Sequence, residues 1–391
     1  MISLHGVHLM NHGPGRINIE GSTIASMHLP DHDGQDDRST RFHFDDAIAF
    51  PGLINSHDHL DFNLFPRLGN RIYSNCPQWG ADIHAVNRKT IDAILNIPQP
   101  LRTQWGLYKN LLNGVTTVVQ HGEHLRLSDP VIDVFQQCNV LHSVQQEPHW
   151  KLKLNNPFAR GWPFVIHAGE GTDGQSLNDI DTLIRWNVFR RELIGVHGVA
   201  MNEEQASAFA ALVWCPDSNY FLLNRTADIP RLQRKTTVVF GTDSTLSASW
   251  NLWEQLRLAR KLGMMTDEAL FQSVTQTPAT VWRLPRKGIL REGGQADIVV
   301  AKRAGGGEDD LAAWFAVNPE DIMLVIQNGS VRLCDEARYR QLRENRSSVE
   351  AFSQIVLQDS TKYVRGNLPG LIAEIKEYAP GAVFPIGSSN A

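Results

Sequence analysis

The chain has 391 residues, of which 42% are hydrophobic and 20% are charged. This composition excludes a largely disordered protein and gives enough length for a large buried core. The formal net charge of -5 provides no basic footprint for nucleic acid or for an anionic membrane, and we expect neither as a partner. No apolar run approaches the length of a membrane span.

The cysteines and the first residues of the chain both favour a cytoplasmic protein. The four cysteines lie far apart and form no C-x-x-C pair, which predicts neither a disulfide framework nor a cysteine-built zinc site. The segment Met1–His5 lacks the basic region and the long apolar stretch of a secretory signal. We therefore expect a reduced, cytoplasmic protein.

Residues 1–50 are predicted to form the first part of a small β domain. Short apolar runs alternate there with turn residues, including a polar loop over 31–39, as in short antiparallel strands. Six of the 15 histidines fall in this region. Their spacing is tied to no carboxylate, so we interpret them as ordinary strand and loop residues rather than metal ligands.

Residues 51–284 alternate strands with helices, which predicts a mostly parallel sheet and, with functional residues at strand ends, a (β/α) barrel of the TIM type. Helices are expected over 101–113, from Asp129-Pro130, over 177–189, from Asn202 with Gln205 in a capping box, over 249–262 and over 267–276. Seven strands are predicted, ending near Ser56, Val119, Val144, Ile166, Val196, Trp214 and Phe240. Residues 145–163 are too few for a full repeat, so either one repeat is degenerate or the count is incomplete.

The rest of the chain returns to short strands. Residues 285–334 are predicted to pair with the N-terminal strands, so that both chain ends build one small β-sandwich-like domain. Residues 335–391 are predicted to form a helical C-terminal extension with a tail, and residues 387–391 are expected to be disordered.

Imidazoles and carboxylates stand at the carboxyl ends of several of these strands. His57 and His59 are two residues apart, so both side chains face the same side of a strand and Asp58 faces away. His167 ends another strand with Glu170 three residues on, His197 ends a third, and Asp243 follows the strand that ends near Phe240. Three imidazoles and a carboxylate from strand ends can hold a divalent metal and leave a position for water. Each residue alone also fits a structural role: a helix cap for Asp243, a solvent-exposed Glu170 or a core His197.

Six segments together resemble the amidohydrolase superfamily. They are Phe50–His59, Gly114–Val119, His167–Glu170, His197, Cys215–Asn219 and Gly241–Ser244. The branch they are most similar to contains cytosine and guanine deaminases and the triazine hydrolases. The resemblance runs from about residue 48 to about residue 300, and residues 288–300 are similar to that family's return to its β domain.

The resemblance implies a function and a role for each site residue. His57, His59, His167 and Asp243 would bind one divalent metal, with zinc as the first expectation and iron as the alternative. Glu170 matches the family's proton shuttle, and His197 matches the histidine that polarises the group under attack. Asp243 would also act in catalysis, by accepting the proton of the attacking water. The implied activity is hydrolysis of a carbon–nitrogen bond other than a peptide bond, as an aminohydrolase (deaminase) of a small heterocyclic or amidine substrate.

Two other readings stay open. Related branches use two metals bridged by a carboxylated lysine, and Lys151 and Lys153 lie in the corresponding region, which leaves a two-metal amide or cyclic-amide hydrolase as an alternative. The missing repeat leaves a non-catalytic barrel scaffold as the other. Substrate contacts are expected from loops at the strand ends, and no specific role is assigned to any of them. The candidates are Gln120, His121, Gln145, Trp214, Asp217 and residues 63–79, which include Arg67, Arg71, Tyr73 and Trp79. The sequence leaves open whether the protein is a homo-oligomer.

Overall fold

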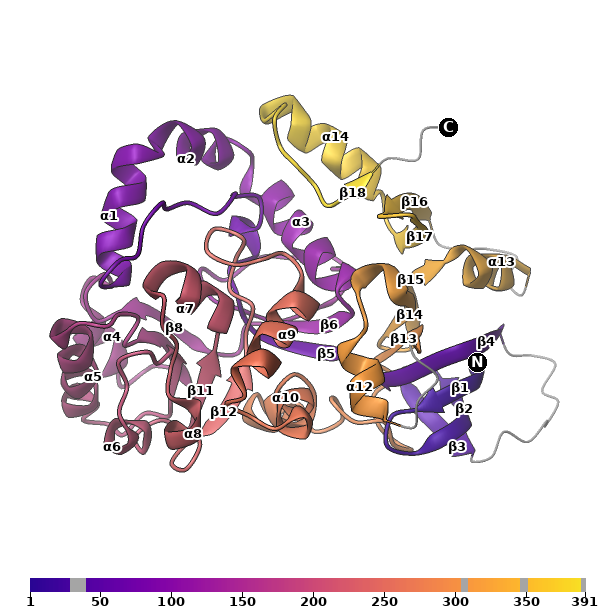
Figure 1. The fold of residues 1–391 in the computed structure, drawn as a ribbon, viewed down its shortest axis with the longest axis horizontal. Coiled ribbons are helices and arrows are strands. Elements are labelled where there is room, and N and C mark those ends of the chain that lie inside the picture. The colour runs from indigo at the N-terminus through magenta and orange to yellow at the C-terminus, as the bar shows by residue number, and fades with distance from the viewer. Residues whose placement is uncertain (29–39, 304–308, 345–350, 388–391) are drawn as a thin grey trace.

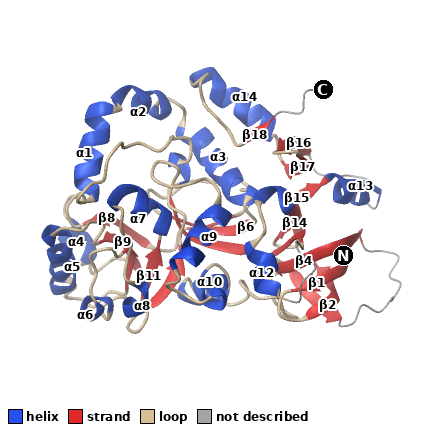
Figure 2. Ribbon diagram, viewed as in Figure 1, coloured by secondary structure: helices blue, strands red, loops and turns tan. Residues whose placement is uncertain are grey.

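A computed structural model describes residues 1–28, 40–303, 309–344 and 351–387. Its strands form three sheets, and the helices lie on the outside of the two sheets that carry the site (Figures 1 and 2). The predicted polar loop over 31–39 and the last four residues of the predicted tail lie outside the described residues.

The strands and helices have the following bounds. The strands are β1 Ile2–Leu9, β2 Gly13–Glu20, β3 Thr23–His28, β4 Thr40–Pro51, β5 Leu53–Asp58, β6 Val115–Gln120, β7 Asp133–Phe135, β8 Asn139–Ser143, β9 Phe164–Ala168, β10 Leu193–His197, β11 Ala211–Trp214, β12 Thr237–Phe240, β13 Ile298–Lys302, β14 Ile322–Gln327, β15 Ser330–Asp335, β16 Phe352–Leu357, β17 Ser360–Arg365 and β18 Ile386–Gly387. The helices are α1 Cys76–Val86, α2 Arg88–Leu95, α3 Gln99–Leu112, α4 Trp150–Leu154, α5 Gly174–Trp186, α6 Glu203–Ala206, α7 Pro216–Leu223, α8 Ile229–Leu232, α9 Leu252–Leu262, α10 Asp267–Ser273, α11 Gln276–Val281, α12 Asp310–Phe315, α13 Glu336–Glu344 and α14 Leu368–Tyr378.

Strands β5 to β12 are the strands of the expected barrel. All neighbours pair in parallel, in the order β5-β6-β7 in one sheet and β12-β11-β10-β9-β8 in the other. Among the described residues, the ladder does not continue from β7 to β8 or from β12 to β5, so no continuous strand ladder closes the barrel. Parallel strands carry their carboxyl ends to one edge, which is where the candidate site residues lie.

The count of seven barrel strands was incomplete, because the described residues contain eight, β5 to β12. The missing one is β7, where a helix starting at Asp129-Pro130 was predicted instead. Asp129 has a left-handed φ of 48° and is not a helix cap. Strand β7 has only three residues, all half-buried, so it has no recognisable apolar pattern. Residues 145–163 hold only the five-residue α4 and the loops that connect β8 to β9.

Other predicted helices agree with the structure within a few residues. Helix α3 ends at Leu112, with Asn113 as its C-cap and Gly114 directly after it, as the C-cap pattern predicts. The capping box at α6 is also confirmed: the Asn202 side chain accepts from the backbone of Gln205, and the Gln205 side chain accepts from the backbone of Asn202.

Strands from both chain ends meet in one ten-stranded sheet, in the order β18-β16-β17-β15-β14-β13-β4-β1-β2-β3. Strand β13 pairs with β4, and β4 leads through Gly52 directly into β5. The strands therefore pair as expected but in a single sheet, and the division into domains at residues 50, 284 and 334 stays a prediction. The predicted helical C-terminal extension contains α13 and α14, but it also contains strands that were not predicted: β16 and β17 form a hairpin that extends this sheet beside β15.

Candidate metal centre and active site

Strand β5 presents two imidazoles at its carboxyl end. All six of its residues are buried, and the His57 side chain is completely so. The His59 side chain retains 15% of its exposure and stacks against Phe62. The rings of His57 and His59 are 5.0 Å apart, so the i, i+2 spacing places both on one side of the strand as predicted.

The other predicted residues come from β9, β10 and the turn after β12. His167 is the second-last residue of β9, His197 is the last residue of β10, and Asp243 follows the end of β12 by three residues. His197 and Asp243 have left-handed φ values of 72° and 58°. A residue other than glycine pays about 1–2 kcal/mol for this conformation, so the fold holds both side chains at some cost.

Three of the four predicted ligands, His57, His59 and Asp243, form one compact group, and His167 approaches it at His57. The Nε2 atoms of His57 and His167 are 3.4 Å apart. Asp243 Oδ1 lies 3.9 Å from His57 Nε2 and 4.0 Å from His59 Nε2. Two overlapping groups have all their ligand atoms within 4.8 Å of one another: His57 with His59 and Asp243, and His57 with His167 and His197. His57 is thus common to both groups.

These residues suit a divalent metal such as zinc. Nitrogen and carboxylate donors are the ligands that zinc takes in catalytic sites. Burial, reinforced by neighbouring histidines, holds the pKa of His57 and of His167 well below the ordinary value. Both imidazoles are therefore neutral near pH 7 and offer the lone pairs that metal binding needs. The close approach of the Nε2 atoms of His57 and His167 inside the protein fits a cation that both imidazoles bind.

Asp243 is held as a carboxylate. Its Oδ1 accepts from the backbone of Ser244 at 2.7 Å, and its Oδ2 accepts from Ser218 and Ser247 at 2.7 and 3.0 Å. Burial acts to raise its pKa, but His197, His59 and the bonds from Ser218 and Ser244 outweigh burial, so the pKa lies below the usual range. Sequence reasoning did not anticipate the two serine hydroxyls.

Glu170 has the opposite character. It lies in the loop after β9, and burial raises its pKa above the ordinary value, although His197 and a hydrogen bond from Cys76 partly oppose this. Its Oε1 lies 3.6 Å from His197 Nε2. The two predicted catalytic carboxyl groups therefore differ, one favouring the charged form and the other the protonated form.

Two further histidines surround the cluster. His121, directly after β6, is buried and stacks on His167 with ring centroids 4.4 Å apart at 20°. His142 in β8 makes an edge contact with His167 at 5.1 Å. Burial lowers the pKa of both, further helped by neighbouring histidines. His121 was a predicted contact without a role, and His142 was missed because no motif surrounds it.

The segment from Leu68 to α1 covers the site. The backbone of Leu68 donates to Leu246, that of Tyr73 to Leu222 and that of Cys76 to Glu170. The cavity that touches His167 and Glu170 has a volume of about 30 Å³. This space has room for water but is far below the roughly 300–1,000 Å³ of a ligand pocket. We call residues 68–79 the lid, because Cys76 and Pro77 line this space together with His167 and Glu170.

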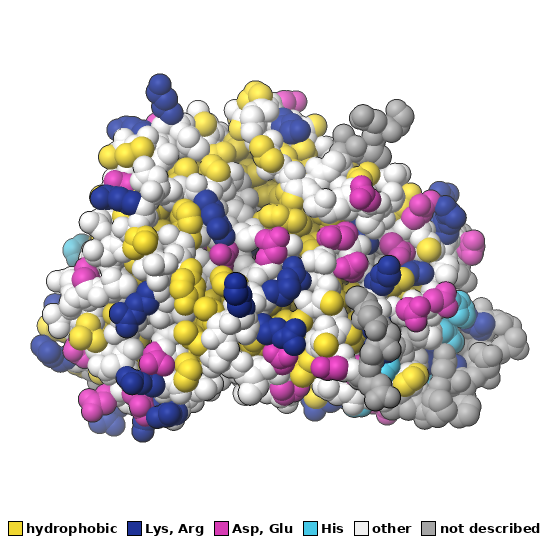
Figure 3. Space-filling model, in the orientation of Figure 1, with side chains coloured by type: hydrophobic (Ala, Val, Ile, Leu, Met, Phe, Trp, Pro, Cys, Tyr) yellow, Lys and Arg dark blue, Asp and Glu magenta, His cyan; other side chains and the backbone are white. Residues whose placement is uncertain are grey.

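A larger cleft lies beside the site. It has a volume of about 1020 Å³ and an apolar wall that includes Phe65, Trp105 and Phe384. Figure 3 shows apolar side chains gathered in the upper middle of one face of the molecule. None of the four predicted ligands lines the cleft, but Asn63 and Thr245 do, and they bond to each other behind the site.

Most of the other proposed substrate contacts have structural partners. Trp214 is completely buried in the core, and Gln120 accepts from the backbone of Leu60. Gln145 bonds to Asp179, and Arg67 pairs with Asp217. Arg71 and Tyr73 both bind Asp82, and Trp79 donates to Leu68 within the lid.

The two lysines considered for a second metal do not point to one. Both lie exposed on α4, not on a strand. Lys153 pairs with Glu147, and the Lys151 ammonium lies over the Trp186 ring.

The sequence and the fold were compared with known proteins. Residues 158–332 match the model of the amidohydrolase family. No curated protein matches the sequence significantly. The family match confirms the predicted resemblance to the amidohydrolase superfamily over this part of the chain.

Solved structures share the fold at low sequence identity. An adenosine deaminase from Xanthomonas campestris with bound zinc superimposes with a TM-score of 0.71 and 16% identity, over 97% of each chain. An atrazine chlorohydrolase from Arthrobacter aurescens complexed with zinc gives 0.60 and 17%, over 88% of this chain and 99% of that one. An N-isopropylammelide isopropylaminohydrolase from Burkholderia multivorans gives 0.58 and 15%, over 85% and 98%. These similarities support the TIM-type arrangement.

Within the described part of the chain, no helix has both the length and the apolar character needed to cross a membrane.

Proposed function

We propose that this protein is a one-metal hydrolase that removes ammonia or an amine from a carbon of a small heterocyclic or amidine substrate. The observation that carries the proposal is the pair of ligand groups that share His57. His59 and Asp243 lie close to it in one group, His167 and His197 in the other, and Glu170 lies beside His197. The fold is shared with an adenosine deaminase and with an isopropylaminohydrolase, which supports this reaction class.

The four converging residues would hold the metal, and zinc suits them best. When bound there, a divalent cation supplies an activated water as nucleophile near neutral pH. Asp243 is suited to accept the proton of that water, because its hydrogen bonds and neighbouring imidazoles keep it ionised.

Glu170 is suited to move a proton to the leaving nitrogen. The raised pKa keeps a proton on its carboxyl group over a wider pH range than for an exposed glutamate. His197 Nε2 lies on the same side as Glu170 Oε1 and can contact the atom that gains charge during attack. The closed lid would exclude bulk water around these groups.

The second candidate, a two-metal amide hydrolase, is less well supported because Lys151 and Lys153 are exposed on α4. The third, a scaffold without activity, is disfavoured by the complete ligand set.

The test combines metal analysis with a substrate screen. Purified protein is expected to contain about one zinc or iron per chain, and a metal-stripped sample should regain hydrolysis of a heterocyclic amine when zinc is added. Two metals per chain would favour the second candidate. Absence of bound metal together with absence of metal-dependent stabilisation would favour the scaffold.

A further inference from the structure

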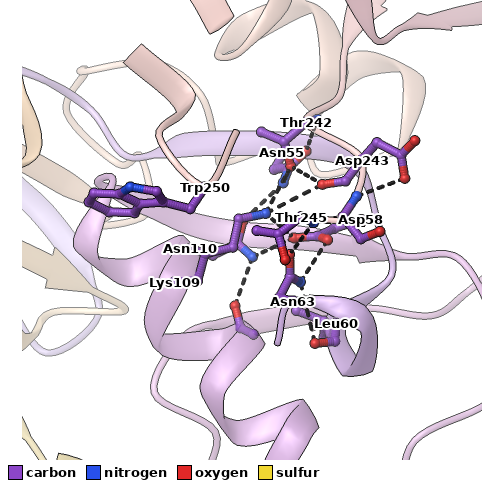
Figure 4. A network of polar contacts seen from close by, with 12 residues as sticks. Asn55, Asp58, Leu60, Asn63, Lys109, Asn110, Thr242, Asp243, Thr245 and Trp250 are labelled. Atoms are coloured by element: carbon purple, nitrogen blue, oxygen red, sulfur yellow. Dashed lines mark hydrogen bonds and ion pairs between the residues drawn. The ribbon is translucent and has the colours of Figure 1, made fainter. Parts of the chain in front are cut away.

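We infer that the buried ion pair of Lys109 and Asp58 is a positioning device that locks the two halves of the metal centre together across the open seam between β5 and β12. The inference rests on the metal centre proposed above and assigns a role to residues outside it. Figure 4 shows the network around this pair.

The seam is a discontinuity in the fold. Strands β5 and β12 belong to different sheets, with no ladder between them in the described structure. His57 and His59 are on the β5 side, whereas Asp243 is on the β12 side. The two strands are nevertheless very close, since a methyl group added at Gly241 would lie 2.7 Å from the Cβ atom of His57. One backbone bond crosses near the site, from Asp243 to the His57 carbonyl at 3.0 Å.

Side chains bridge the seam where the ladder is missing. Asn55 in β5 accepts from the backbone of Thr242 at 3.0 Å and donates to the Thr242 hydroxyl at 2.8 Å. Lys109, on α3, donates to Asp58 at 2.9 Å, to the Thr242 hydroxyl at 3.2 Å and to the Asp243 carbonyl at 3.4 Å. One ammonium group therefore binds both sides of the seam.

Asp58 fixes the strand that carries two of the ligands. It lies between His57 and His59 and points away from them, as the strand geometry requires. Its carboxylate accepts from Lys109 and Asn110 on one oxygen and from Asn63 on the other. With three donors the carboxylate cannot turn, so the flanking imidazoles are held at a fixed angle to Asp243.

The pair is wholly inside the protein, with side-chain exposures of 2% for Lys109 and 0% for Asp58. Buried pairs of this kind seldom add stability compared with apolar side chains of the same size. The presence of such a pair beside the site fits a positioning role, for which a fixed geometry matters more than stability.

The test measures zinc binding to metal-stripped protein by competition with a chelator, and the visible absorption of the cobalt(II)-substituted protein. Lys109→Met is expected to weaken zinc binding by about 10- to 100-fold and to change the cobalt spectrum. Asp58→Asn is the milder variant, because it keeps the side-chain shape, and it should change both readouts in the same direction. The double variant should lose little more than either single variant if the two residues act as one unit.

The matched control is Lys287→Met. Lys287 is also a buried lysine, bound at 2.5 Å to both Asp133 and Asp297, and none of its partners is a predicted ligand. The Lys287→Met variant should lose stability but keep its zinc affinity and its cobalt spectrum. The inference is overturned if Lys109→Met and Asp58→Asn, like the control, lose only stability. If the unaltered protein binds no zinc, the proposed metal centre itself fails, which is a separate and recognisable result.

Discussion

Asn219 accepts a hydrogen bond from His197, with 2.9 Å between Oδ1 and Nδ1. On its other side, Asn219 Nδ2 donates to the Thr226 hydroxyl at 3.1 Å. His197 therefore carries its proton on Nδ1 when neutral, and Nε2 faces Glu170. A side chain on α7 thus sets the tautomer of a residue on β10.

Replacing Asn219 by leucine should lower activity by about 10- to 100-fold, because His197 loses the acceptor that fixes its tautomer and its ring angle. Asn219→Asp keeps an acceptor at the same place and should restore part of the loss. The measurement is the turnover of the best substrate from the screen, with circular dichroism to verify folding. Full activity in Asn219→Leu would show that His197 needs no such partner.

Glu170→Gln should lower activity by about 10²- to 10⁴-fold, because the amide cannot move a proton, while the zinc content stays unchanged. Kinetics and metal analysis of the same preparation check both parts. Loss of zinc in this variant would contradict the role of Glu170 as a residue beside the metal rather than a ligand.

The same substitution predicts a stability gain in the metal-free protein. The folded-state pKa of Glu170 is raised by burial, so folded protein binds more protons than unfolded protein between the ordinary pKa and the raised one. Stability is thus lost as pH rises through that interval. Glu170→Gln escapes this loss and should unfold at higher denaturant concentration at pH 7.5 than unaltered protein.

Asp243→Asn should change stability in the opposite direction to Glu170→Gln. The folded-state pKa of Asp243 is lowered, so its contribution to stability is present above the unfolded pKa and is lost as pH falls through the folded one. Metal-free Asp243→Asn should therefore be less stable than unaltered protein at pH 7.5. Equal shifts of the same sign in both carboxyl variants would contradict the different environments of the two groups.

The strand-end residues could be predicted because each motif is local. His57 and His59 reveal their shared face by spacing alone, and a histidine that ends an apolar run indicates a strand tip. Strand β7 could not be predicted, since three half-buried residues have no periodicity. Its neighbour Asp129 is followed by proline, which imitates a helix start, although its backbone is left-handed.

The groups behind the site were missed for a different reason. A lysine within a helix is nearly always exposed, so the sequence gives no sign that Lys109 is buried beside Asp58. The sequence also gives no sign of the contacts made by Ser218 and Asn219. Both lie in the Cys215–Asn219 segment that carries the family resemblance, but no role was predicted for either. Partners of this kind depend on how α3 and α7 pack against the strands, and no local pattern reports that packing.

The buried histidines predict a steep acid dependence of stability in the metal-free protein. The folded-state pKa values of His57, His121 and His167 are well below the ordinary value of 6.5, first because of burial. Unfolded protein therefore binds more protons below about pH 6.5, and stability falls as pH decreases. For each such histidine, the free energy of unfolding falls by about 1.4 kcal/mol per pH unit as pH decreases in that range.

Denaturant unfolding between pH 5 and 7.5 measures this slope. His121→Asn should reduce it by the share of one proton, whereas substitution of the exposed His84 on α1 serves as the control for loss of an imidazole. Bound zinc should raise stability at each pH without flattening the dependence, because it keeps the folded imidazoles neutral while those of the unfolded protein still take up protons. A flat profile in the metal-free protein would contradict the burial of these rings.

Opening of the lid can be followed at Cys76. This residue begins α1, its backbone donates to Glu170, and its thiol hydrogen bonds to the Glu170 carboxylate. Burial, and next the charge of Glu170, raise the pKa of the thiol, so it stays protonated and unreactive while the lid is closed. Cys138, Cys215 and Cys334 are buried, so slow labelling by a maleimide in the folded protein should occur first at Cys76.

The rate of that labelling should rise when the lid is loosened. Asn75→Ala removes the side chain that caps α1 and that bonds to Asp173 across the lid edge, so it should speed modification of Cys76 several-fold. A bound substrate analogue should slow it, since the closed lid is the state that encloses the ligand. Mass spectrometry of peptides identifies the labelled cysteine. Labelling at the same rate in Asn75→Ala and the unaltered protein would mean that this edge does not hold the lid shut.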